Sequence, residues 1–123
     1  MKLIANDKVK HYNIDASNYR YGHLCQEVAT LLMGKKDILR NFNKPEVVVT
    51  ITNISNVQFS GKNKIKQIKT YKHSGYFGGL KIRDAEYYFK KNLVNKLFIY
   101  SLRKMIPKNV IMNTRISRNL IFK

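Results

Sequence analysis

Acidic side chains are scarce in this sequence. Its 123 residues include 24 Lys and Arg but only seven Asp and Glu, which gives a formal net charge of +17. None of the seven acids lies in residues 47–83 or 87–123. Segments of one charge sign repel themselves unless a partner supplies the opposite sign, and the usual polyanionic partner is nucleic acid. The imbalance therefore favours nucleic-acid binding over a charged surface that is merely solvated.

Cysteine and long apolar runs are also rare. The single cysteine, Cys25, excludes an internal disulfide and fits a reducing compartment. No window approaches the run of about 18 apolar residues that a membrane-spanning helix needs. Residues 1–10 resemble neither a secretory signal nor a transit peptide, so we expect no cleaved leader. The apolar helix faces are needed for a core, and we predict a soluble protein that binds no membrane.

Nothing in the sequence forms a recognisable catalytic or metal site. The candidate ligands His11, His23, His73 and Cys25 show no zinc-like spacing. Cys25 lies on an apolar helix stripe and lacks the cationic surroundings that would activate its thiol. No phosphate-binding glycine motif is present, and the few acids suggest no acid–base pair. We therefore predict no enzyme activity, no cofactor, no metal and no small-molecule substrate.

The apolar pattern predicts a mixed α/β fold. Strands are expected at residues 11–16, 47–52, 57–59 and 120–122, and helices at 22–33, around 82–89 and at 93–105. The run VVVTIT at 47–52 is typical of a strand covered on both faces. Gly34 is expected to end the first helix, and residues 38–45 to form an irregular connection. We predict one domain over residues 1–123, with a three-layer α/β/α architecture and a small, mostly parallel sheet of about four strands.

Basic residues are concentrated in three segments outside the loop of residues 71–81, which is described below. Lys35 and Lys36 follow the first helix, where they complement its negative end or bind phosphate. A basic C-terminal tail covers about residues 107–123 and includes Arg115 and Arg118, and a basic arm covers about residues 61–72. The lysines of this arm are Lys62, Lys64, Lys66, Lys69 and Lys72. Phosphate contact is favoured for this arm over a solvated hairpin that binds nothing.

Residues 71–81, YKHSGYFGGLK, combine flexible backbone, flat rings and positive charge. Glycines let backbone amides approach phosphate oxygens, and the flanking lysines neutralise the phosphates. Two interpretations stay open for Tyr76 and Phe77: they stack on RNA bases, or they anchor the loop in the core.

Four segments carry a family resemblance: YNIDAS, GHLCQEVATLLMGKK, TYKHSGYFGGLK and KMIPKN, in this order. Together they resemble the universal large-subunit ribosomal protein L-thirteen family. The resemblance implies an α/β/α fold, a place in the large ribosomal subunit against its rRNA and neighbouring ribosomal proteins, and a role early in subunit assembly. The rRNA contacts that it implies are Lys35, Lys36, Lys72, His73, Ser74, Gly75, Gly78, Gly79, Lys81, Arg103, Lys104, Lys108 and Asn109.

The sequence departs from the family pattern in several places. His23 stands where the family usually has arginine, residues 43–46 replace a usual T-G-D, and Met112 replaces a usual glycine. These departures and the abundant Asn, Lys, Ile and Tyr suggest a divergent member from a mitochondrion or plastid rather than from bacterial cytoplasm. Two other functions remain open: a free RNA-binding regulator of messenger RNA, and a small nuclease. A nuclease would require Asp84, Glu86 and His73 to converge.

Overall fold

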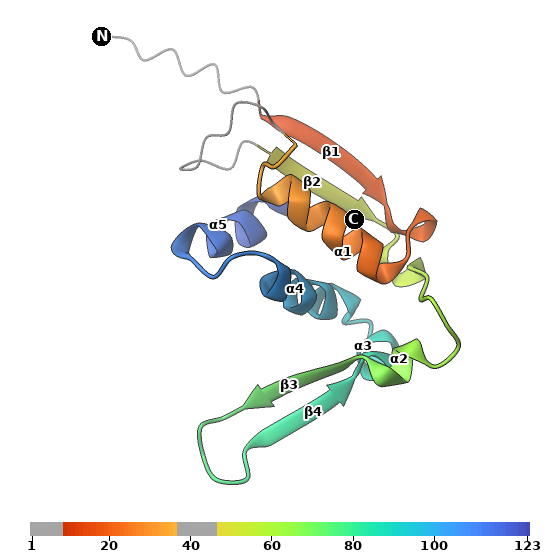
Figure 1. Cartoon of the computed structure of the whole chain (residues 1–123). Coiled ribbons are helices and arrows are strands. Elements are labelled where there is room, and N and C mark those ends of the chain that lie inside the picture. The colour runs from red at the N-terminus through yellow and green to blue at the C-terminus, as the bar shows by residue number, and fades with distance from the viewer. Residues whose placement is uncertain (1–8, 37–46) are drawn as a thin grey trace.

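The computed structural model describes residues 9–36 and 47–123, and their arrangement is shown in Figure 1. The strands of these residues are β1 (Lys10–Asp15), β2 (Val47–Thr52), β3 (Lys69–His73), β4 (Leu80–Asp84) and β5 (Leu120–Phe122). The α-helices are α1 (Tyr21–Leu32), α2 (Lys64–Gln67), α3 (Ala85–Lys90), α4 (Val94–Met105) and α5 (Val110–Asn119), and two 3-10 turns are η1 (Ala16–Asn18) and η2 (Ile54–Asn56).

The main sheet is parallel and has the strand order β1-β2-β5. This arrangement confirms the predicted α/β class, the single domain and the mostly parallel sheet. Within the described residues the sheet has three strands, not about four, because residues 57–59 form only an isolated bridge between Arg20 and Gln58. The strands β3 and β4 pair with each other in a separate antiparallel hairpin.

The central strand β2 presents two different faces. Val47, Val49 and Ile51 are buried, whereas the residues between them are only partly buried. The helices α1 and α5 both contact this strand. No residue of β2 is exposed, so the expectation of a strand covered on both faces is met, although one face is buried more deeply than the other. One face carries the core and the other is partly open.

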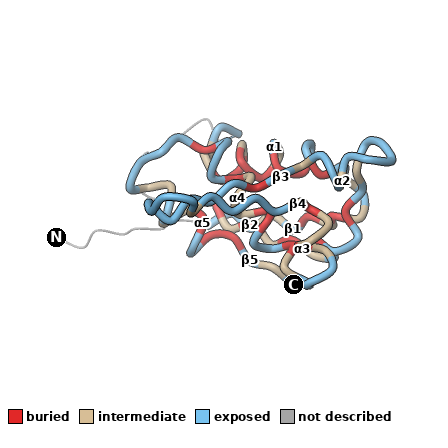
Figure 2. Tube along the Cα trace, turned by 90° about the horizontal axis from the view of Figure 1, so that it is seen from below, coloured by how far each residue is buried: buried red, intermediate tan, exposed pale blue. Residues whose placement is uncertain are grey.

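The core lies where α1 and α4 pack together beneath the sheet. Leu24 and Val28 of α1 and Leu97, Phe98 and Leu102 of α4 are completely shielded from solvent. Both helices have the three-and-four apolar spacing that places one stripe inside. In contrast, Figure 2 shows the strands of the β3–β4 hairpin as mostly exposed. The hairpin is thus an extension from a packed body.

The remaining element predictions are mostly confirmed. Gly34 has the left-handed φ of 68° expected after α1. The short third helix begins only at Ala85, because Ile82 belongs to β4. The helix α5 spans ten residues within the stretch predicted as a basic C-terminal tail. The connection predicted for residues 38–45 lies outside the described residues. Among the helices that are described, none has the length and apolarity to cross a bilayer.

Candidate nucleic-acid interface

The stretch 71–81 is a β-hairpin with a short loop, and its pairing sorts the side chains onto two faces. Lys72 lies opposite Lys81, and Thr70 lies opposite Arg83. Because side chains alternate along a strand, Lys72, Lys81 and Arg83 share one face, which we call the cationic face. Like charges directly opposite each other are destabilising. A hairpin with this face gains stability when an anion lies against it.

The other face of the hairpin is apolar. Tyr71 pairs with Ile82, and His73 pairs with Leu80. The side chains of Tyr71, Leu80 and Ile82 are each about half exposed.

The loop tip carries two aromatic rings in open solvent. Tyr76 is 80% exposed and Phe77 is 109% exposed, as much as in an extended chain. Figure 1 shows the loop at the end of the hairpin farthest from the main sheet. The interpretation of these rings as core anchors is therefore wrong. Their faces are available to a partner, as base stacking requires.

Glycine and short polar side chains fix the shape of this loop. Gly75 and Gly78 have φ values of 88° and 71°, a region that favours glycine. A Cβ on Gly79 would lie 2.0 Å from Ser74 Oγ and 3.0 Å from the Tyr76 carbonyl oxygen. The Gly75 N–H donates to His73 Nδ1 at 2.9 Å, and the Ser74 N–H donates to the Gly79 carbonyl at 3.2 Å. Four predicted contact residues, His73, Ser74, Gly75 and Gly79, thus hold one another in place.

Three contacts fix the hairpin on the body. The Thr70 and Tyr88 hydroxyls are hydrogen-bonded at 2.8 Å in a buried position. The N–H of Tyr71 donates to the Tyr100 hydroxyl at 3.2 Å. At the base of the hairpin, the Ala85 N–H donates to the Ile68 carbonyl at 2.8 Å. The cationic face is therefore held at a defined position beside α3 and α4.

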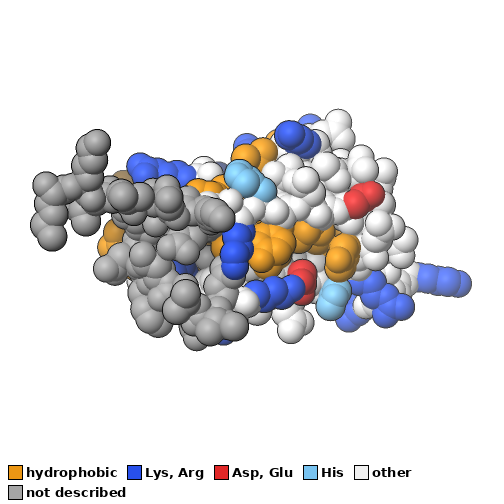
Figure 3. All heavy atoms as spheres, turned by 90° about the horizontal axis from the view of Figure 1, so that it is seen from above, with side chains coloured by type: hydrophobic (Ala, Val, Ile, Leu, Met, Phe, Trp, Pro, Cys, Tyr) orange, Lys and Arg blue, Asp and Glu red, His pale blue; other side chains and the backbone are white. Residues whose placement is uncertain are grey.

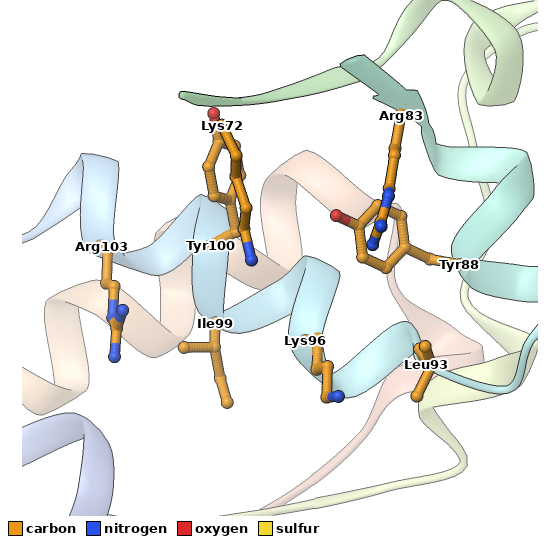
Figure 4. A pocket seen from close by; sticks show the side chains of 8 residues that line it. All are labelled: Lys72, Arg83, Tyr88, Leu93, Lys96, Ile99, Tyr100 and Arg103. Atoms are coloured by element: carbon orange, nitrogen blue, oxygen red, sulfur yellow. The ribbon is translucent and has the colours of Figure 1, made fainter. Parts of the chain in front are cut away.

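A groove of about 310 Å³ lies between the cationic face and α4, and we call it the α4 groove. Figure 4 shows the side chains that line it: Lys72, Arg83, Tyr88, Leu93, Lys96, Ile99, Tyr100 and Arg103. No carboxylate from the described residues lines this groove. The groove is therefore a concave, positively charged surface of the kind that suits phosphate.

Tyr100 occupies a strongly positive part of this groove. The hydrogen bond from the Tyr71 N–H, helped by Lys104, holds the pKa of the Tyr100 phenol below its ordinary value. The Lys104 ammonium lies 4.5 Å from the centre of the Tyr100 ring. Two contacts thus fix the ring, and both favour negative charge at its hydroxyl.

Only two of the eight lining residues, Lys72 and Arg103, were predicted from sequence, and those missed include Arg83, Lys96 and Tyr100. A signal for two of them was available, because Lys96, Tyr100 and Arg103 follow the i, i+4, i+7 spacing of one helix face. Arg83 lies opposite Thr70, and only the hairpin register brings it to the groove. Lys72 and Arg103, both predicted, do meet there.

The predicted basic arm of residues 61–72 does not form one continuous element. Lys62 lies in a turn, Lys64 and Lys66 lie in α2, and Lys69 begins β3 opposite Asp84. These lysines are exposed. They lie beside the hairpin base and stay predictions as RNA contacts.

The lysines after α1 differ from each other. Lys36 forms an ion pair with Glu27, and the hydrogen bond from this pair raises the pKa of Lys36. Lys35 is exposed. Part of the charge predicted here for RNA is therefore already compensated within the protein.

The C-terminal tail predicted as basic is an integral part of the fold. Asn109 caps α5, where its side-chain oxygen accepts from the Met112 N–H at 3.0 Å. Lys108 and Arg118 are exposed, whereas Arg115 is partly buried and its Nε atom has no hydrogen-bond partner. Asn109 therefore has a structural role in addition to any contact with RNA.

Positive charge extends beyond the hairpin. On the face shown in Figure 3, blue Lys and Arg side chains are more widespread than red acidic side chains.

Among the described residues, no group of three or more His, Cys, Asp and Glu side chains could hold a metal ion. Burial raises the pKa of Cys25 to about 12, so its thiol stays protonated and unreactive at neutral pH.

The acids and histidine required for a nuclease do not converge. His73 pairs with Leu80 at the loop end of the hairpin, whereas Asp84 pairs with Lys69 at the opposite end. Glu86 lies in α3, where its ion pair with Lys90 at 2.8 Å lowers the Glu86 pKa. These side chains form no common site.

The sequence of this chain is similar to those of known proteins. The family model described as Ribosomal protein L13 matches residues 9–123. A protein named large ribosomal subunit protein uL13 from Nautilia profundicola is 35% identical over 114 residues, which cover 89% of this chain and 74% of that protein. The protein of the same name from Helicobacter pylori strain G27 is 32% identical over 123 residues, which cover 96% of this chain and 84% of that protein. The protein of the same name from Malacoplasma penetrans is 34% identical over 116 residues, which cover 93% of this chain and 77% of that protein. With a family match over nearly its whole length and relatives this similar, the chain belongs to the Ribosomal protein L13 family.

Proposed function

We propose that this protein is a structural constituent of the large ribosomal subunit that binds large-subunit rRNA and supports early subunit assembly. It performs no catalysis, in keeping with its family. The observation that carries the binding role is the α4 groove, where cations of the hairpin and of α4 meet and no described residue adds a carboxylate. Membership of the Ribosomal protein L13 family supports the assignment to the large subunit.

The mechanism is electrostatic and geometric. Lysines and arginines displace counterions from RNA phosphates, so affinity falls as salt rises. The packing of α1 against α4 and the Thr70–Tyr88 hydrogen bond hold the cationic face in a fixed position. The exposed rings of Tyr76 and Phe77 stack on unpaired bases beyond the groove. RNA is thus bound by shape and charge, not by a chemical reaction.

The contact residues that we propose fall into a central and an outer group. The central group surrounds the α4 groove and the loop, and contains Lys72, His73, Ser74, Gly75, Gly78, Gly79, Lys81, Arg103 and Lys104. The outer group contains Lys35, Lys36, Lys62, Lys64, Lys66, Lys69, Lys108, Asn109, Arg115 and Arg118. Neighbouring proteins of the large subunit are further proposed partners.

The compartment remains a separate proposal. The relatives described above are bacterial and give no support to the organelle that the composition suggested. A mitochondrial or plastid origin rests only on the Asn-, Lys-, Ile- and Tyr-rich composition and on the departures from the family pattern. Fractionation of source cells into organelles and cytosol, followed by detection of the protein in the ribosomes of each fraction, decides between them.

A paired charge reversal tests the proposed function. In the variant with Lys72→Glu and Arg103→Glu, two cations that line the α4 groove become anions. We expect its incorporation into large subunits to fall at least about tenfold. Each cation that neutralises a phosphate releases counterions and so favours binding, and the variant loses two such cations. Sucrose-gradient sedimentation in high salt, with detection of the tagged protein, measures the incorporated fraction.

The matched control reverses two exposed lysines that do not line the groove, Lys91→Glu and Lys123→Glu. It changes the net charge equally and should leave most of the incorporation intact. Normal sedimentation of the groove variant with subunits would refute the rRNA role of the groove. Loss in both variants alike would show that net charge alone governs binding.

A free regulator of messenger RNA is the alternative that shares this chemistry. It predicts a large pool of protein outside ribosomes, with messenger RNA bound to it. Immunoprecipitation from the ribosome-free supernatant, followed by sequencing of the RNA, distinguishes the two. The nuclease alternative loses its basis because His73, Asp84 and Glu86 lie apart.

A further inference from the structure

The α4 groove has a rim of four cations. Lys72 and Arg83 extend into it from the hairpin, while Lys96 and Arg103 come from α4 (Figure 4). Within residues 9–36 and 47–123, no ion pair joins any of the four to a carboxylate. The Arg83 guanidinium lies 4.9 Å from the centre of the Tyr87 ring, a contact that leaves its charge in place. The four charges are therefore not neutralised by a carboxylate of these residues and can attract an external anion.

Between these cations the groove is apolar. Leu93 and Ile99 are partly buried, Tyr88 is buried, and the partly buried ring of Tyr100 lies next to them. A purely electrostatic phosphate site would have no use for such a surface, because phosphate is strongly hydrated. Flat or weakly polar groups favour contact with aliphatic and aromatic side chains.

The Tyr100 ring is held before any ligand arrives. Its hydroxyl accepts the Tyr71 N–H at 3.2 Å, and the Lys104 ammonium lies 4.5 Å from the ring centre. A ring with a fixed position loses little conformational freedom when it meets a ligand. Tyr100 is thus a prepared contact surface within the groove.

The volume of the groove limits what can enter. A groove of about 310 Å³ is at the small end of the range of ligand pockets, roughly 300–1,000 Å³. A nucleic-acid helix cannot enter it, whereas a single nucleotide fits this scale. We infer that the α4 groove receives one unstacked nucleotide of RNA, its phosphate among the four cations and its base against Ile99 and Tyr100. This inference rests on the proposed function and adds a defined subsite to it.

An acidic peptide is the other ligand to weigh. Its carboxylates would satisfy the rim, but the aliphatic and aromatic wall between Leu93 and Tyr100 would meet no flat partner. A nucleotide carries a phosphate and a flat base in one unit, close enough together for a narrow groove. A groove with both a cationic rim and an apolar wall therefore favours RNA over an acidic peptide.

The test fills the groove without changing its charge. Ile99→Trp adds volume at a partly buried position that lines the groove. The full chain and this variant are titrated with a hexa-adenylate oligoribonucleotide, with inorganic polyphosphate of similar charge, and with a hexaglutamate peptide. We expect the variant to bind the oligoribonucleotide about tenfold more weakly, as loss of one stacked base predicts. Its affinity for polyphosphate should be unchanged.

A second variant tests the subsite independently, in case Ile99→Trp does not fold. Lys96→Gln with Arg103→Gln removes rim charges without adding bulk, and Lys91→Gln with Lys123→Gln is its charge-matched control. Ultraviolet cross-linking of the unaltered protein to the oligoribonucleotide, mapped by mass spectrometry, should include Tyr100. The cross-link should be lost in the Ile99→Trp and rim variants and kept in the control.

Each other outcome overturns the subsite. If polyphosphate or hexaglutamate binds as tightly as the oligoribonucleotide, the groove is a general anion surface. If Ile99→Trp folds and binds like the unaltered chain, or if Tyr100 gives no cross-link, no base enters it. Failure here, with normal incorporation of the unaltered protein into subunits, leaves the proposed function intact. Absence of the unaltered protein from subunits would instead reject the proposed function.

Discussion

At the scale of single residues, the hairpin loop depends on glycine for two distinct reasons. Gly75 and Gly78 have positive φ, whereas Gly79 lies too close to Ser74 and to the Tyr76 carbonyl for a side chain to fit. Because the loop is exposed and far from the core, its shape and the stability of the protein are separable. Substitutions here should affect recognition more than folding.

Gly79→Ala is expected to weaken rRNA binding with little loss of stability. The added Cβ would lie 2.0 Å from Ser74 Oγ and 3.0 Å from the Tyr76 carbonyl oxygen, so the Ser74 side chain must move and the carbonyl must give slightly. We expect affinity for large-subunit rRNA, measured by filter binding, to fall about tenfold, equivalent to about 1.4 kcal/mol. The free energy of unfolding should change by less than about 1 kcal/mol, as for other exposed sites.

Gly22→Ala is the matched glycine control. Gly22 lies in the first turn of α1, and a Cβ there meets no atom within 4 Å. Alanine is the better helix former by up to about 1 kcal/mol, so stability should rise while rRNA affinity stays constant. Equal rRNA affinities for Gly79→Ala and Gly22→Ala would contradict a role for the loop shape.

Cys25 gives the protein a pH dependence on the alkaline side. Burial raises its thiol pKa from the ordinary 9.0 to about 12. Between these values the unfolded chain has lost a proton that the folded protein keeps. The free energy of unfolding therefore falls as pH rises from 9 to 12, by on the order of 1 kcal/mol per pH unit. Urea unfolding at several pH values measures this slope.

The Cys25→Ala variant should show a shallower decline over the same pH interval. Burial also raises the pKa of Tyr21, and that contribution remains in the variant. An unchanged slope would mean that the thiol is open to solvent, which its complete burial argues against.

At the scale of elements, the sequence predicted best those that have a long apolar stripe. The helices α1 and α4 each bury one continuous stripe of side chains. These buried side chains are apolar and recur every three or four residues, which is the spacing that predicts a helix. The hairpin has no such stripe, because four of the five residues of β3 are exposed. Leu80, Lys81, Ile82 and Arg83 do alternate between apolar and cationic side chains, but this run is short and directly follows the glycines, so residues 71–81 looked like a loop.

The candidate site was predictable only in part for a related reason. Lys72 and Arg103 were identified from motifs, but tertiary contacts hold the hairpin beside the helices: Thr70 bonds Tyr88 of α3, and Tyr71 bonds Tyr100 of α4. Nothing local to Arg83 indicates that its side chain will reach the same groove. Charge and motifs thus predicted the kind of partner, and the fold was needed for the geometry.

Tyr88→Phe tests how the hairpin is held. The variant loses the hydroxyl that is hydrogen-bonded to Thr70 at 2.8 Å, and we expect a loss of stability of about 1 kcal/mol. Amide hydrogen exchange in β3 should become faster, while exchange in α1 stays the same. Tyr87→Phe, at the neighbouring tyrosine, should alter neither quantity.

A double-mutant cycle with Thr70→Val isolates this contact. The combined variant should lose less stability than the sum of the two single changes, by roughly 0.5 kcal/mol or more. Strict additivity would mean that the Thr70–Tyr88 hydrogen bond does not hold the hairpin.

At the scale of the whole molecule, salt should act in opposite directions on the free protein and on its complex. The net charge of +17 repels itself, and the screening length is about 10 Å at 0.1 M salt. Raising sodium chloride from about 0.05 to 0.5 M should stabilise the free protein by on the order of 1 kcal/mol. The same change should weaken the rRNA complex steeply.

Thermal unfolding and filter binding across one salt series measure both effects. Sucrose at matched osmolality is the control for general solvent effects. A free protein that loses stability as salt rises would show that its charges are already balanced internally.

The fully exposed ring of Phe77 makes the unassembled protein prone to aggregation. Together with the half-exposed Tyr71, Leu80 and Ile82, this ring offers apolar surface to other molecules, and the cations of the hairpin attract polyanions. Synthesis in step with the binding partner, or protection by a chaperone, therefore matters more here than for a protein with a polar tip. Turbidity of a concentrated solution should fall on Phe77→Ser, and an unchanged turbidity would assign the adhesion to another surface.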